Sequence, residues 1–167
     1  ILPAFVKEVL NAGPETLGIL RAAPAAGAVI TGIYLAKRPI LTDSGKHLLI
    51  SVAGFGVSII AFGLSRNLWI CALFLFASGC CDAVSVVIRG SIMQLTTPDH
   101  MRGRISAING IFIGSSNELG ALESGIAASM MGLVPSIVFG GVATIAIVLI
   151  TYRLAPHLSK LHLKDIS

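Results

Sequence analysis

Long apolar runs alternate with short polar segments along this chain. Residues 1–6 are mostly apolar but too few to cross a membrane, and we interpret them as the end of a helix. Five longer apolar runs follow, at residues 17–35, 48–64, 68–95, 105–133 and 135–152. About 20 helical residues cross a hydrocarbon core of about 30 Å. The pattern therefore predicts an all-α integral membrane protein with five complete transmembrane helices and the end of a sixth.

The composition favours a membrane protein over a soluble domain. Hydrophobic residues make up 54% of the chain and charged residues 12%, with a mean hydropathy of +0.88. Soluble domains carry about a quarter charged residues. The net charge is +4, but the basic residues flank the apolar runs instead of gathering on one helix with aromatic residues. The sequence therefore gives no indication of a nucleic-acid partner.

Lysine and arginine are distributed unevenly between the two ends of the predicted spans. The two basic residues at one end are Lys7 and Arg66, and Arg21 lies inside the first complete span. The nine at the other end are Lys37, Arg38, Lys46, Arg89, Arg102, Arg104, Arg153, Lys160 and Lys164. Cytoplasmic loops carry the excess of positive charge in membrane proteins. We therefore expect the end with nine basic residues, and the tail at 153–167, to be cytoplasmic.

Polar residues within the apolar runs are the candidates for function. In residues 68–95, Ser78, Asp82, Ser85 and Arg89 recur at spacings of four, three and four, which places them on one helical face. An ionisable side chain at membrane depth is by default a functional hypothesis, and the alternative is a structural charge pair or hydrogen bond. The candidates for substrate-facing or proton-linked groups are Asp82, Glu118, Glu123, Arg21, Asn109 and Asn117.

The distribution of polar groups also predicts where each span lies. Residues 48–64 and 135–152 carry no ionisable residue and are expected to be peripheral. Residues 105–133 are polar or small on two sides, so we expect them to lie between helices or beside a water-filled cavity. The spacing Gly110-x-x-x-Gly114 in this span predicts a close helix approach inside one bundle.

Depth along the helices predicts an ion pair. Arg21 lies about 6 Å from the outer end of its span, and Glu118 about 10 Å from the outer face of the membrane. These similar levels predict that Arg21 pairs with Glu118, or with Glu123 if the helix tilts. The alternative is that Arg21 extends its side chain to the outer headgroups.

Several other chemistries are not indicated. The cysteines Cys71, Cys80 and Cys81 lie in one span and are expected to pack without a disulfide. No glycine-rich phosphate loop is present in the sequence. The histidines lie in predicted loops or the tail, at His47, His100, His157 and His162. We therefore expect no metal, no cofactor and no enzymatic activity, an intramembrane enzyme being the most distant alternative.

The segment Thr97-Pro98-Asp99-His100-Met101-Arg102-Gly103-Arg104 resembles the cytoplasmic loop before the eleventh helix of major facilitator superfamily transporters. The residues that carry this loop motif are Pro98, Asp99, Arg102, Gly103 and Arg104. The segments Gly18-Ile19-Leu20-Arg21-Ala22-Ala23-Pro24 and Asn117-Glu118-Leu119-Gly120 are similar to the branch that includes the enterobactin exporter and related drug exporters.

The resemblance implies that residues 1–167 are the carboxy-terminal half of such a transporter. It implies helix seven ending at 1–6, helices eight to twelve at 17–35, 48–64, 68–95, 105–133 and 135–152, and a cytoplasmic tail at 153–167. The superfamily's motif between helices eight and nine is reduced here to Gly32, Lys37-Arg38, Gly45 and Lys46 without its acidic residue. No gating role is therefore expected of that loop.

The function implied by the resemblance is proton-coupled export of a siderophore, drug or similar bulky organic molecule across the bacterial inner membrane. The implied partners are membrane lipid, the missing amino-terminal half of the transporter and the small organic substrate. Alternating access between two halves would move the substrate. The alternative is a truncated membrane remnant or assembly module that does not transport.

Overall fold

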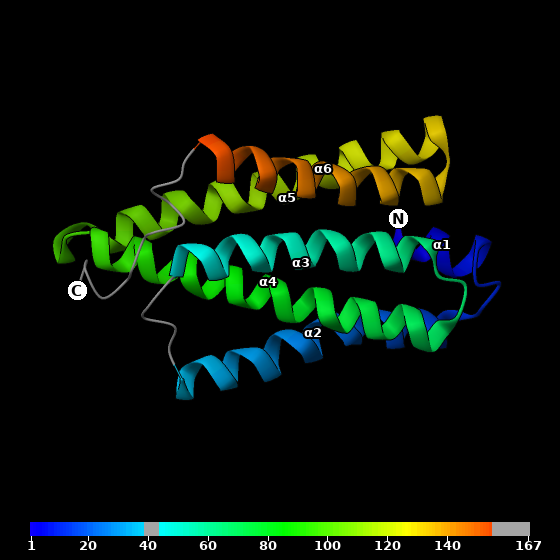
Figure 1. Cartoon of the computed structure of the whole chain (residues 1–167), viewed down its shortest axis with the longest axis horizontal. Helices are drawn as coiled ribbons and strands as arrows, with labels where there is room; N and C mark the ends of the chain where they lie inside the picture. The colour runs from blue at the N-terminus through cyan, green and yellow to red at the C-terminus, as the bar shows by residue number, and fades with distance from the viewer. Residues whose placement is uncertain (39–43, 155–167) are drawn as a thin grey trace.

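The structure is a computed structural model that describes residues 1–38 and 44–154, and these residues form six α-helices and one short 3-10 helix (Figure 1). No β-strand occurs in these two ranges. The helices are α1 (Leu2–Glu8), α2 (Pro14–Lys37), α3 (Ser44–Leu64), α4 (Leu68–Thr96), η1 (Asp99–Met101), α5 (Arg102–Met131) and α6 (Leu133–Leu154). The all-α membrane fold predicted from the sequence is confirmed. The predicted tail at 153–167 falls mostly outside the described residues.

The boundary between α5 and α6 differs slightly from the prediction. Helix α5 was expected to reach residue 133 but ends at Met131, because Gly132 takes a positive φ of 89°. Glycine adopts this backbone region without a steric penalty, so it commonly ends helices. The Gly132 N–H donates to the carbonyl of Ala128 at 3.0 Å, and the Ser136 N–H donates to the carbonyl of Gly132 at 3.2 Å. This hydrogen-bonded turn reverses the chain into α6.

The number of membrane-crossing helices also differs from the prediction. Within the described ranges, α2, α3, α4 and α6 are the four helices that are both long enough and apolar enough to cross a membrane. Helix α1, where the sequence predicted only the end of a span, is a separate helix of 7 residues. The described residues therefore form six α-helices in place of the predicted five complete helices and partial sixth. Helix α5 has 30 residues, which is ample length, but its polar residues place it outside this apolar group.

The helices pack as an open row. Helix α2 packs on α4, α4 on α3, α3 on α6, and α6 on α5, so that α3 lies between α4 and α6 (Figure 1). Residues 48–64 and 135–152 were expected to be peripheral, but α3 lies between α4 and α6, and α6 lies between α3 and α5, so that expectation is wrong for both helices. Helix α5 stands at one edge of the row and has no buried residue, so other helices of this chain do not enclose it. The expected alternative, a water-filled cavity beside this helix, stays a prediction. The uncovered surface of α5 is the main asymmetry of the fold.

Helix α1 anchors one end of the row. Its Phe5 and Val6 are buried in an apolar cluster with side chains from α2, α3, α4 and α6. The rings of Phe5 and Phe62 pack with their centroids 4.5 Å apart. The other members of the cluster are Leu20, Cys71, Leu75 and Ile137. A short helix therefore joins four longer ones at this end.

Glycines allow the closest helix approaches. A Cβ added at Gly79 of α4 would overlap the backbone of Pro24 in α2, and one added at Gly141 of α6 would lie 2.8 Å from the carbonyl oxygen of Gly56 in α3. Small residues are the usual means by which membrane helices bring their backbones together. Gly110 and Gly114 have no neighbouring atom within 4 Å of an added Cβ, so the close approach predicted there does not form.

Replacing Gly79 with alanine should destabilise the protein, because the new methyl group would push α2 away from α4. Overpacking of this kind costs about 1–3 kcal/mol. Thermal unfolding in detergent micelles, followed by circular dichroism, measures the change. Gly90→Ala is the matched control in the same helix, since nothing lies within 4 Å of its added Cβ. It should leave stability unchanged or raise it by up to about 1 kcal/mol. Equal loss in both variants would contradict the packing role of Gly79.

Candidate functional site

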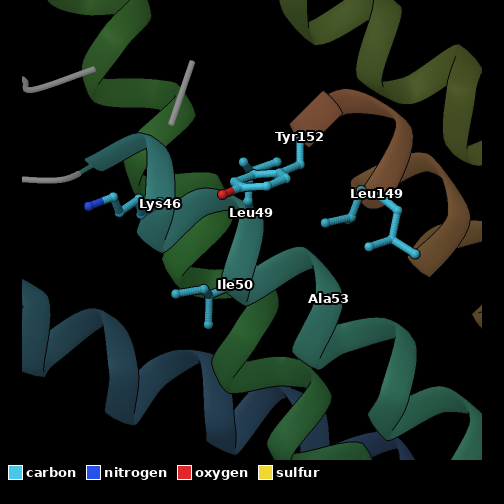
Figure 2. A pocket seen from close by; sticks show the side chains of 7 residues that line it. Lys46, Leu49, Ile50, Ala53, Leu149 and Tyr152 are labelled. Carbon is cyan, nitrogen blue, oxygen red and sulfur yellow. The ribbon is translucent and has the colours of Figure 1, made fainter. Parts of the chain in front are cut away.

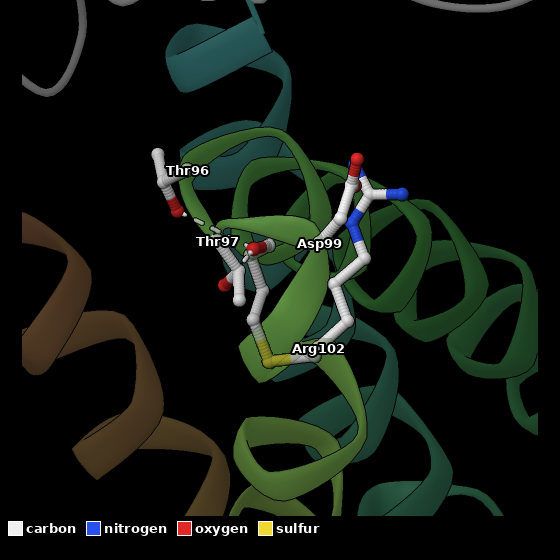
Figure 3. A network of polar contacts seen from close by, with 5 residues as sticks. Thr96, Thr97, Asp99 and Arg102 are labelled. Atoms are coloured by element: carbon white, nitrogen blue, oxygen red, sulfur yellow. Dashed lines mark hydrogen bonds and ion pairs between the residues drawn. The ribbon is translucent and has the colours of Figure 1, made fainter.

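The segment between α4 and α5 is organised by local hydrogen bonds (Figure 3). Thr97 is extended, with φ −98° and ψ 125°, because the proline that follows it disfavours a helical conformation. Its hydroxyl donates to the carbonyl of Met93 at 2.6 Å, and the Thr96 hydroxyl donates to the carbonyl of Ile92 at 2.8 Å. The Met93 carbonyl belongs to the last turn of α4, where helix ends leave acceptors without backbone partners. The Thr97 hydroxyl thus satisfies an acceptor at the end of α4.

The predicted loop motif starts α5. Pro98 precedes η1, and the guanidinium of Arg102 pairs with the carboxylate of Asp99 at 3.0 Å. The two side chains are 55% and 87% exposed, and exposed pairs of this kind contribute about 0–1 kcal/mol. Gly103 and Arg104 are exposed in the first turn of α5. The motif residues therefore shape the helix junction at the surface, where Thr97 and Arg102 line a cavity of only about 20 Å³.

A polar cavity of about 220 Å³ lies between α3, α4 and α6. It contains the side chains of Asp82 and Arg89, which the sequence placed on one face of α4. Ser85 between them is buried, and the Arg89 Nε donates to its carbonyl at 3.4 Å. Both charged side chains are exposed to the cavity and, within the described residues, form no ion pair with each other. The remaining lining residues are Ser51, Val52, Phe55, Cys81 and Thr144.

The cavity lies on the same face of α4 as the residues that pack with α1. On α4, Cys71 and Leu75 belong to the apolar cluster around α1, and Ser78, Asp82 and Ser85 follow on the same face at spacings of three, four and three. On α3, Phe62 belongs to that cluster, and Phe55, two turns away on the same face, lines the cavity. The face of α4 is therefore apolar beside α1 and polar at the cavity.

The other predicted site residues lie elsewhere. Asn117, Glu118 and Glu123 are exposed on α5, Asn109 on the same helix is half-buried, and Arg21 is exposed on α2. Their helices are at opposite edges of the row and share no extended contact. Within the described residues no ion pair joins Arg21 to either glutamate, so the pairing predicted from depth is wrong for this chain. Depth fixes the level of a residue in the membrane but not which helices are neighbours.

Five cavity residues were missed by the sequence prediction: Ser51, Val52, Phe55, Cys81 and Thr144. The Ser51 hydroxyl donates to the carbonyl of His47 at 2.7 Å, and the Thr144 hydroxyl donates to that of Gly140 at 2.9 Å. Cys81 lies on α4 beside Asp82 but was expected only to pack. The other four residues come from α3 and α6, so a period of three to four residues on α4 could not identify them, because the sequence does not give the placement of neighbouring helices.

The described residues form an all-α integral membrane protein with a polar cavity among its helices. The whole chain apart from its last two residues, 1–165, matches the transmembrane secretion effector family of the major facilitator superfamily, and the chain belongs to that family. It is thus a member of a membrane transporter family. No curated protein matches the chain, and no solved structure matches it.

The three cysteines should report whether water enters the cavity. Cys81 lines the cavity, whereas Cys71 is fully buried. A positively charged thiosulfonate reagent reacts with thiols that water reaches, and Asp82 should attract it. In variants that keep one cysteine each, Cys81 should be modified faster than Cys71, as followed by mass spectrometry. Equal rates, or a faster reaction at Cys71, would mean that the cavity is dry.

Proposed function

We propose that this chain is the carboxy-terminal half of a proton-coupled exporter for a bulky organic molecule such as a siderophore or drug. The observation that carries the proposal is the exposure of polar α5. This helix has 30 residues, none buried, and its Glu118 and Glu123 are uncovered. Placing an acidic side chain at the centre of a bilayer costs about 2.5–3.5 kcal/mol on insertion scales. A water-filled pathway or a polar partner beside α5 removes that cost.

The partner that we propose for the uncovered surface of α5 is the amino-terminal half of such a transporter. The row of helices is open at α5, and Asp82 and Arg89 are exposed at the cavity between α3, α4 and α6. A second bundle facing α5 and this cavity would enclose Asp82 and the α5 glutamates in a shared pathway. Transporters of this architecture place the substrate between two repeats that rock against each other. The substrate would therefore contact α5 in the assembled protein.

Asp82 and Glu118 are the candidates for proton coupling. Asp82 lies about 20 Å along α4 from its start at Leu68, deep in the helix, and shares its cavity with Arg89. A carboxylate can take up a proton in one state and release it in another when the rocking motion changes the surrounding charges and water. Arg89 is a charged neighbour of this kind for Asp82. Glu118 would meet a charged neighbour only across the interface with the second bundle.

Neutralising a coupling carboxylate should uncouple transport. In the assembled transporter, Asp82→Asn and Glu118→Gln should each lose proton-driven efflux of a fluorescent drug from proteoliposomes. Exchange of labelled for unlabelled drug should persist, because exchange needs no net proton movement. Glu15→Gln, an acidic residue in the first turn of α2, is the control and should keep both activities. Unchanged efflux in both variants would reject this role. Absence of efflux from the unmodified protein would favour an inactive remnant or assembly module.

The proposed orientation places the α4–α5 junction in the cytoplasm. His100 in this junction and Asn67 before α4 are both exposed and lie at opposite ends of α4. In a cysteine-free background, an impermeant thiol reagent added outside intact cells should label Asn67→Cys and not His100→Cys. The excess of lysine and arginine at the His100 end is the physical reason. Labelling of His100→Cys alone would invert the orientation.

A further inference from the structure

Two cavities border α3, and they differ in charge. The larger has a volume of about 300 Å³ and lies between α3 and α6, lined by apolar side chains and the Tyr152 ring (Figure 2). Within the described residues, Lys46 is its one charged lining residue. The smaller is the polar cavity of about 220 Å³, which is lined by both an acidic and a basic residue, Asp82 and Arg89. The polar cavity therefore presents opposite charges to a molecule that enters it.

The two charged residues of the polar cavity do not neutralise each other. Asp82 and Arg89 are seven residues apart on one face of α4, or about 10 Å along the helix. Both side chains are exposed, and neither forms an ion pair with another described residue. The Arg89 Nε donates to the carbonyl of Ser85 at 3.4 Å. This leaves the two terminal nitrogens of the guanidinium for a bidentate contact with a carboxylate.

The neighbouring helix α3 makes the two ends of the cavity chemically different. A Cβ added at Gly54 would lie 2.9 Å from the Cys81 Sγ, so the next residue along α3, Phe55, is at the level of Asp82. An aromatic ring beside a carboxylate favours an ammonium group. Arg89 is two turns further along α4 and has no acidic neighbour in the cavity lining. The cavity therefore has one end suited to a cation and one end suited to an anion.

We propose that this cavity binds a compact zwitterion, or the zwitterionic arm of a larger molecule, with its ammonium group at Asp82 and its carboxylate at Arg89. Pockets for drug-sized ligands have volumes of about 300–1,000 Å³, so a cavity of about 220 Å³ holds a smaller group. Because the two residues are two turns apart, the charges of the ligand need a spacer of several carbon atoms. That this ligand is the exported molecule rests on the proposed function, whereas its binding does not.

Calorimetric titration of the full chain in detergent micelles tests the proposal, with 6-aminohexanoate as the probe. Its amide, 6-aminohexanamide, keeps only the ammonium charge, and N-acetyl-6-aminohexanoate keeps only the carboxylate charge. Glycine carries both charges without the spacer. Each of these three compounds loses one charged contact, so each should bind at least about tenfold more weakly than 6-aminohexanoate. Equal affinities of 6-aminohexanoate and its two singly charged analogues would overturn the proposal.

Charge variants assign the two ends of the ligand. Asp82→Asn should remove the advantage of 6-aminohexanoate over its N-acetyl analogue, and Arg89→Gln should remove its advantage over the amide. Glu15→Gln and Arg66→Gln remove the same charges from exposed positions outside the cavity and should leave all affinities unchanged. Circular dichroism confirms that each variant is folded. Equal losses in the cavity variants and in these controls would also overturn the proposal.

Protection of Cys81 locates the bound ligand, because this cysteine lines the cavity. In a variant that keeps Cys81 alone, saturating 6-aminohexanoate should slow modification by the thiosulfonate reagent, and adding Asp82→Asn should remove the protection. An unchanged rate with the ligand bound would place it elsewhere and overturn the proposal. Zwitterion binding without drug efflux would uphold this site and reject the proposed export. Drug efflux without zwitterion binding would uphold export and reject the site.

Discussion

Backbone contact at glycines is the constraint on which the arrangement of this protein depends. Lipid tails are as apolar as the side chains that face them, so membrane helices associate through close packing more than through the hydrophobic effect. Gly79 lets α4 meet the backbone of Pro24, and Gly56 and Gly141 bring α3 and α6 together. These two crossings, with α3 packed on α4, fix a row of four helices. The positions of the cavity and of α5 follow from that row.

The row explains why polar groups are sheltered in some places and uncovered in others. Ser78 and Ser85 are buried between helices, and the Ser78 hydroxyl donates to the carbonyl of Leu75 at 2.7 Å. Within the described residues, no buried side-chain nitrogen or oxygen lacks a hydrogen-bond partner. The uncovered polar residues at the level of the helices include Asp82 and Arg89 on α4 and Asn117, Glu118 and Glu123 on α5. The buried polar side chains therefore have hydrogen-bond partners within the chain, whereas the exposed ones on α5 form a surface suited to a partner.

The junction between α4 and α5 shows how a recognisable motif can act through local structure. Thr97 ends one helix because Pro98 follows it, and Asp99 pairs with Arg102 at the start of the next. The exposed ion pair adds little stability. The junction nevertheless sets where α5 begins, and therefore which of its residues lie at the level of the cavity. The motif contributes geometry more than binding energy.

The sequence by itself determined the helices and the polar face of α4. Long apolar runs have one stable solution in a bilayer, and a spacing of three and four residues fixes which side chains share a helical face. The bounds of α2, α3, α4 and α6 could be predicted for that reason to within a few residues. Only the tertiary structure decided that α3 is central, that Arg21 and Glu118 are apart, and that Ser51 and Thr144 join Asp82 in one cavity. Sequence gives depth and helical phase, but neighbours depend on contacts between helices, which small residues distant in the chain control.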